Sequence, residues 1–221
     1  MKLKWLIALL FANVMLVSCA YVSPTLSIKI EGNGSVAVFV GGRLADTCQA
    51  ASCTFSYPRG SRLQLRAEPG EKQYFLSWRG SCGGYSNCEL NLEQEAEVIA
   101  EFKPARGSFT ARLMDEAVAV PRGGEGRLNI EIIPSDDFNV PDRAIKVELE
   151  GPIIGEGKDQ VKARYLGPSQ GYKLVVALSP APETPIGIAT LVKVRVGLPG
   201  MYQEVKFGLM VTECAGGCDA D

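Results

Sequence analysis

The sequence predicts an all-β protein built from two modules. From residue 26 almost to the end of the chain, apolar residues alternate with polar ones, which is the period of a β-strand with one buried face. Clusters of glycine and proline interrupt the alternation, as turns between antiparallel strands do. Apart from the first residues, no apolar stripe has the spacing and length of a helix. These patterns favour a small β-rich module followed by a β-sandwich.

The chain begins with a secretory leader, predicted over residues 1–18. Lys2 and Lys4 precede a short apolar run, residues 5–17, which is typical of a signal peptide and too short to cross a bilayer comfortably as a helix. The run ends in Leu-Val-Ser-Cys, which resembles the lipobox of bacterial lipoproteins. This resemblance implies that Cys19 is lipidated, as by palmitate, and that residues 19–24 form a tether. Ala20, where an inner-membrane lipoprotein typically has aspartate, implies the outer membrane if two membranes are present. A cleaved signal peptide with a chance cysteine is the alternative.

Six further cysteines form three close pairs in the sequence: Cys48 with Cys53, Cys82 with Cys88, and Cys214 with Cys218. An even number of cysteines in an exported chain indicates disulfides. Six cysteines allow about fifteen connectivities, so pairing of close neighbours is a hypothesis. A thiolate metal site is the weaker alternative, because the CxxC spacing of zinc sites is lacking.

The first module is expected over residues 25–104. Its apolar segments are residues 26–30, 36–40, 55–57, 63–67, 74–78, 90–92 and 98–102. Glycine-rich or proline-containing turns separate several of them. The sequence thus indicates an antiparallel sheet with short connections.

The residue pattern of this module resembles the divergent InlB B-repeat of bacterial surface proteins. Several features occur in the same order as in that family. They are the turns, the two cysteine pairs, Tyr57 before Gly60, the run from Phe75 to Cys82 and the closing segment 98–102. The resemblance implies a compact β-grasp-like fold, no enzymatic activity, paired cysteines, and a packing role for Trp78. The repeat occurs once here, whereas the family is often tandem.

A short boundary at residues 104–108 separates this module from a second one, expected over residues 105–213 and followed by a tail, residues 214–221. Its expected strands are 109–113, 117–120, 128–132, 145–149, 161–165, 174–178, 192–196 and 205–211. So many short strands in about a hundred residues indicate a β-sandwich. Their order, with the proline-containing loop 181–187, resembles bacterial immunoglobulin-like domains, although the tryptophan and inter-sheet disulfide of antibody-type members are lacking.

Composition excludes several classes of function. Histidine is absent, so the chain lacks Ser-His-Asp and Cys-His nucleophiles and every zinc site that contains histidine. We expect no enzyme, no catalytic residues, no metal and no cofactor. Without Lys2 and Lys4, 21 basic residues face 25 acidic ones, which argues against a nucleic-acid partner.

Four features are candidate sites, each with a structural alternative. Trp78, Tyr74 and Tyr85 form a platform for a sugar ring, or Trp78 fills the core, which the resemblance favours. The glycine-rich loop that contains the predicted Cys82–Cys88 disulfide presents Arg79, Tyr85 and Asn87 as a recognition surface, or is only a staple.

The other two features are charged. Residues 135–142 carry three carboxylates, which suit calcium but lack the spacing of an EF-hand, so a solvated loop is favoured. Basic residues between 43 and 79 and acidic ones between 80 and 101 orient the module on an acidic glycan or anionic lipid, or simply cover its solvent face.

The sequence therefore predicts a lipid-anchored, non-enzymatic protein of the bacterial envelope. It is expected to act in binding or adhesion, with a protein or glycan partner at the cell surface. A carbohydrate-binding envelope lipoprotein and an accessory subunit of a secretion or pilus assembly are the alternatives.

Overall fold

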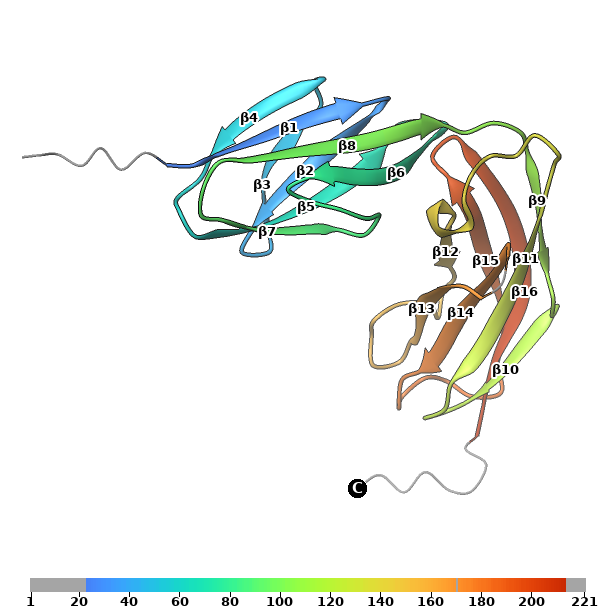
Figure 1. Ribbon diagram of the computed structural model, residues 1–221. Coiled ribbons are helices and arrows are strands. Elements are labelled where there is room, and N and C mark those ends of the chain that lie inside the picture. The colour runs from blue at the N-terminus through green and yellow to red at the C-terminus, as the bar shows by residue number, and fades with distance from the viewer. Residues whose placement is uncertain (1–22, 170, 214–221) are drawn as a thin grey trace, which may run out of the picture.

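The computed structural model describes residues 23–169 and 171–213 (Figure 1). Cys19, Cys214 and Cys218 lie outside these residues, so the predicted anchor and third disulfide remain predictions. The described part contains sixteen strands and one 3-10 turn, Asp142–Ala144. Within this part of the chain, no helix is long and apolar enough to cross a membrane. The all-β prediction is confirmed.

The N-terminal module, defined here as β1 to β8, consists of two facing sheets (Figure 1). Its strands are β1 (Thr25–Glu31), β2 (Gly34–Val40), β3 (Arg43–Cys48), β4 (Ser52–Ser56), β5 (Ser61–Pro69), β6 (Gln73–Gly80), β7 (Cys88–Leu92) and β8 (Ala96–Pro104). One sheet has the order β4-β1-β8-β6 and the other β3-β2-β5-β7. Only the β1–β8 pair of these described strands is parallel.

This sandwich differs from the β-grasp-like layout that the InlB resemblance implied. In a β-grasp, a helix covers the apolar face of the sheet, whereas here a second sheet covers it. The physical reason is the sequence period, because every apolar segment of the module alternates with period two and none offers the stripe of an amphipathic helix.

The strands β3 and β4 were largely missed by the sequence prediction. They lie at the edges of the two sheets, and most of their side chains are exposed or half-buried. An edge strand covers little of the core, so it has no need of the alternating apolar residues that reveal an inner strand. Backbone hydrogen bonds to β2 and β1 hold them instead.

Two disulfides close the open sides of this sandwich. Cys48–Cys53 joins β3 to β4, and Cys82–Cys88 joins the end of β6 to the start of β7. In each case the two strands are edges of opposite sheets, so each disulfide connects the two layers. Chain entropy alone gives such short loops about 2 kcal/mol each, which is a sizeable share of the stability of a small domain.

The C-terminal module, defined here as β9 to β16, is an immunoglobulin-like sandwich (Figure 1). Its strands are β9 (Phe109–Leu113), β10 (Ala117–Pro121), β11 (Gly126–Pro134), β12 (Lys146–Glu150), β13 (Val161–Pro168), β14 (Lys173–Pro180), β15 (Ala189–Leu198) and β16 (Met201–Thr212). The sheet β13-β14-β11-β9 has the strand order of the A-B-E-D layer of immunoglobulin domains, and β16-β15-β12 has that of the G-F-C layer, with β10 added in parallel beside β16. All eight strands expected from the sequence are present.

Each module has its own apolar core, and no strand of one pairs with a strand of the other in the described part of the chain. One side chain departs from this division. Tyr74 lies on β6, in the N-terminal module, but its ring is 8% exposed and belongs to the core cluster of the C-terminal module. Leu76, two residues further along β6, also packs against that cluster. The two cores therefore meet at β6.

Candidate functional site

The expected aromatic platform is not formed. Trp78 is 2% exposed, its ring lies 4.9 Å from that of Phe75 between centroids, and its indole Nε1 donates to the carbonyl of Ser86 at 2.7 Å. Tyr74 is buried in the core of the C-terminal module instead, so Tyr85 is the only one of the three that is exposed. The interpretation of Trp78 as a core residue is confirmed, and the three-aromatic platform is wrong because the register of β6 shifts between Phe75 and Ser77, so that Tyr74 and Trp78 enter different cores instead of sharing one face.

The structure separates the three residues of the predicted recognition loop. The guanidinium of Arg79 pairs with Glu31 and Glu101 on the outer face of the first sheet. Tyr85 lies instead at the junction of the modules, where the guanidinium of Arg143 is 4.8 Å from its ring centroid. Asn87 borders a cleft at the same junction. Tyr85 and Asn87 thus share a surface that Arg79 does not reach.

The acidic segment 135–142 has a structural role. The hydroxyl of Ser135 donates to Asp137 at 2.8 Å, and the amide of Asn139 donates to Pro104 O at 3.0 Å and accepts from the backbone of Arg106 at 2.7 Å. The segment therefore holds the connection between the modules. Among the described residues, no group of three or more cysteine, aspartate or glutamate side chains is placed to hold a metal ion.

Many of the charged side chains of the N-terminal module are paired with a neighbouring side chain of opposite charge. Examples are Lys29–Glu97 between β1 and β8, Arg59–Glu93 between the turns before β5 and after β7, Arg66–Glu68 along β5 and Lys103–Glu101 along β8. The hydrogen bond from Lys103 holds the pKa of Glu101 below its usual value. Exposed pairs of this kind contribute little to stability. The basic and acidic stretches of the sequence are therefore interleaved on the sheets and do not form two opposite surfaces.

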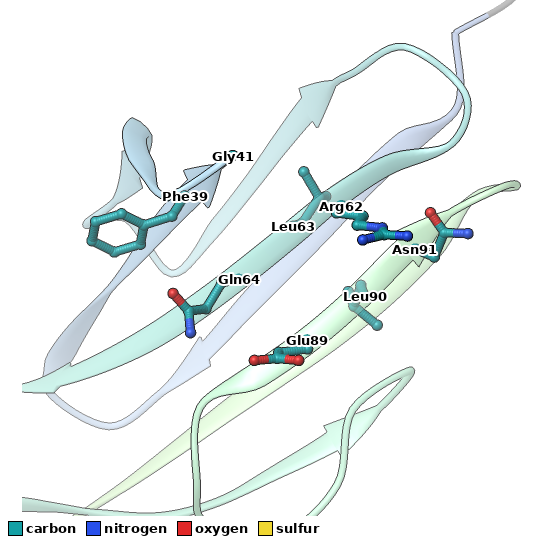
Figure 2. Close-up of a pocket in the computed structure, with 9 residues that line it drawn as sticks. Phe39, Gly41, Arg62, Leu63, Gln64, Glu89, Leu90 and Asn91 are labelled. Carbon is teal, nitrogen blue, oxygen red and sulfur yellow. The ribbon is translucent and has the colours of Figure 1, made fainter.

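A groove of about 480 Å³ lies on the outer face of the second sheet of the N-terminal module (Figure 2). Strand register places its side chains in rows. Phe39 on β2 lies opposite Gln64 on β5, which lies opposite Glu89 on β7. In the next row, Arg62 on β5 lies opposite Asn91 on β7. These five side chains point away from the core, because they alternate with the buried residues of the same strands.

Two glycines leave the end of this groove open. Gly41 and Gly42 connect β2 to β3 with φ values of 57° and 79°, the left-handed conformation that a two-residue hairpin turn requires. A Cβ added at either position would meet no atom within 4 Å. The place beside Arg62 that a side chain on β2 would fill is therefore empty. The same two glycines therefore make the tight turn and leave the surface hollow.

The groove combines an apolar wall with both hydrogen-bond donors and acceptors. The ring of Phe39 is half-buried, and the guanidinium of Arg66 lies 4.9 Å from its centroid, which fixes one side of the wall. The amide of Asn91 donates to Glu93 at 3.0 Å, and Glu93 also pairs with Arg59. Arg62 and Glu89 supply one positive and one negative charge. Such a surface matches a neutral ligand with many hydroxyl groups, because each hydroxyl both donates and accepts.

Sequence reasoning missed this groove because it followed the buried phase of each strand. The signal lay in the outward-facing residues of β2, β5 and β7. These are mostly polar, but Phe39 among them is aromatic and stands just before two glycines. Those positions converge only when the strand order β2-β5-β7 and its register are known. From the sequence, Gly41 and Gly42 indicate only a turn.

Among the shifted groups in the described part of the chain, Tyr57 and Tyr165 show the largest changes. Burial, reinforced by the hydrogen bond that Tyr57 Oη donates to Asp46 at 2.7 Å, raises the pKa of Tyr57. Burial also raises the pKa of Tyr165 to about 12. Both phenols therefore stay protonated and neutral at physiological pH, and neither borders the groove.

Comparison with known proteins gives structural likeness alone. No family model matches the chain, and no curated protein matches it in sequence, so the InlB resemblance remains a prediction. Similar solved structures include domains 4 and 5 of the S-layer protein SbsC, with 10% identity, coverage of 71% of this chain and 67% of that one, and a TM-score of 0.34. The fibronectin(III)-like modules of Clostridium thermocellum CbhA share 9% identity, with coverage of 92% of this chain and 97% of that one and a TM-score of 0.31. The Ig1-Ig2 part of Dpr2, solved in complex with DIP-Theta, shares 10% identity, with coverage of 86% of this chain and 65% of that one and a TM-score of 0.32. The immunoglobulin-like description of the C-terminal module therefore rests on its own strand order.

Proposed function

We propose that this protein is a lipid-anchored, non-enzymatic binding protein of the bacterial envelope, and that its N-terminal module holds a neutral carbohydrate in the groove of Phe39, Arg62, Gln64, Glu89 and Asn91. The observation that carries the proposal is this groove, with one aromatic wall and four polar side chains in two cross-strand rows. A hexose ring has apolar faces for Phe39 and equatorial hydroxyls for the polar rows. Ligand sites of this kind combine an apolar wall with few, well-placed polar groups.

The anchor places this groove near the membrane. Residues 20–24 between Cys19 and β1 span at most about 17 Å when extended. The N-terminal module is therefore the part of the protein held closest to the lipid surface. A ligand that covers or lies within the envelope would be within its reach.

We expect glycan binding to depend on the two polar rows. On a glycan array, Gln64→Ala and Glu89→Gln should each weaken retention of the bound neutral glycan about tenfold, as the loss of hydrogen bonds to a ligand does. Gln203→Ala, which changes an exposed glutamine on β16, is the matched control and should bind as the wild type does. If the array retains no neutral glycan, or if Gln64→Ala and Gln203→Ala bind equally, the groove is not a carbohydrate site.

We also expect the wild-type protein to partition into detergent and to begin at a modified Cys19. Cys19→Ala should stall processing or release a soluble protein, since the acyl chains provide the membrane affinity. The measurement is detergent phase separation followed by mass spectrometry of the N-terminal peptide. A wild-type N-terminus at any other residue would contradict the lipoprotein assignment.

A further inference from the structure

The junction between the two modules is a fixed contact. The backbone N–H of Lys72 donates to Pro199 O at 2.6 Å. Arg143 donates to Leu76 O at 3.5 Å and stacks over Tyr85. With Tyr74 buried in the C-terminal core, the contact joins β6 and the loops on both sides of it to the β15–β16 turn and the 3-10 turn. Side chains from both modules are therefore held in one arrangement before any ligand binds.

A cleft with two lobes opens beside this contact. The smaller lobe, about 150 Å³, is bordered by Phe75, Tyr85 and Arg143. The larger, about 440 Å³, is bordered by Arg66, Glu68 and Asn87. Both lobes share Ala67, Pro69 and Lys146, so they are parts of one cleft, with an apolar floor and Lys146 between them. Ligand sites often occupy clefts of this kind at the contact between domains.

The cleft carries an excess of positive charge. Its only carboxylate among the lining residues is Glu68, which Arg66 pairs with at 3.2 Å. Within the described chain, Lys146 and Arg143 form no ion pair with a carboxylate. Both are exposed, and they border the smaller lobe together. Two uncompensated cations beside an exposed tyrosine ring favour an anion attached to a ring-shaped group.

We infer that this cleft binds an acidic sugar unit of a polysaccharide or glycan. The carboxylate lies between Lys146 and Arg143, the sugar ring lies against the free side of Tyr85, and Asn87 bonds a hydroxyl of the neighbouring unit in the larger lobe. Tyr85 is 63% exposed although Arg143 covers part of its ring, so a ring surface remains available. The inference concerns a different site from the groove. Both border the outward face of β5, but the groove is lined there by Arg62 and Gln64 and the cleft by Arg66 and Glu68, and the two share no lining residue.

The test is titration calorimetry of the full chain with trigalacturonate, using maltotriose as the neutral probe. Trigalacturonate should bind, and Lys146→Ala and Tyr85→Ala should each weaken that binding about tenfold or more, with affinity falling as salt is raised. Lys206→Ala is the matched control, because Lys206 is an exposed lysine on the same sheet but outside the cleft. It should bind as the wild type does.

Three results would overturn the inference. The first is equal affinity of Lys146→Ala and wild type for trigalacturonate. The second is binding of maltotriose that is as tight as that of trigalacturonate and is weakened by Lys146→Ala or Tyr85→Ala, and the third is inorganic phosphate competing fully while Tyr85→Ala has no effect. Unchanged melting of Lys146→Ala, which removes an exposed side chain without an ion pair, excludes misfolding as the cause of lost binding. Gln64→Ala should leave trigalacturonate binding unchanged, so the cleft and the groove can each fail alone.

Discussion

Replacing Trp78 with alanine is expected to lower the free energy of unfolding of the N-terminal module by about 3–5 kcal/mol, as truncation of a buried large aromatic does. The ring is 2% exposed in the centre of the module's core. Its indole Nε1 also satisfies the carbonyl of Ser86, so the variant loses a cross-loop hydrogen bond as well as packing. Urea unfolding followed by circular dichroism measures the change.

Trp78→Phe is the control for this prediction. It keeps an aromatic ring beside Phe75 but leaves Ser86 O without its donor, so the expected loss is smaller, about 1–2 kcal/mol. A fully stable Trp78→Ala protein would mean that the loop and the core are not held together by this residue. Tyr85→Ala should melt near wild type, because its ring is mostly exposed.

Replacing Tyr74 with alanine is expected to destabilise the C-terminal module by about 3 kcal/mol, although the residue belongs to the N-terminal one. The ring is 8% exposed and fills part of the core beneath the immunoglobulin-like sandwich. Tyr74→Phe should be nearly neutral, because the described hydrogen bonds include none from its hydroxyl and the ring is kept. Calorimetry of the full chain measures both variants.

Trp78 makes the location of this effect measurable. Trp5 lies in the predicted leader, so Trp78 is the single tryptophan after residue 18 and its fluorescence reports the N-terminal module. For Tyr74→Ala, the calorimetric transition of the C-terminal module should shift while the fluorescence transition shifts less. Equal shifts of both would show that the modules unfold as one unit. No shift of either would contradict the shared core at β6.

The periodicity of the sequence was sufficient for most inner strands. Val192, Val194 and Val196 alternate with charged residues on β15, and such a pattern has one way to bury its apolar face. Leu128, Ile130 and Ile132 alternate with polar residues on β11 in the same way. The edge strand β3 shows no such pattern. It covers little of the core and is held by backbone hydrogen bonds to β2, so its side chains need not alternate between apolar and polar. Secondary structure was therefore readable wherever a strand had to cover a core.

The candidate sites were less predictable, because each depends on segments that are distant in the sequence. Tyr85 was expected at an exposed tip, and it is exposed, but its neighbour Arg143 comes from the other module. Arg79 was expected beside it, yet Glu31 and Glu101 hold its guanidinium on another face. Long-range ion pairs and stacking contacts of this kind are not encoded in the local spacing of the chain.

The sequence by itself determined that this protein is all-β and that its inner strands fall where the apolar period is two, and it favoured the core position of Trp78 over a sugar platform. Burial enforces these features locally, since a one-residue shift would expose the whole apolar face of a strand. Only the tertiary structure decided that each disulfide connects opposite sheets, that Phe39, Gln64 and Glu89 share a row, and that Tyr74 enters the second core. Those outcomes follow from strand order and register, which depend on the free energy of the whole packed chain.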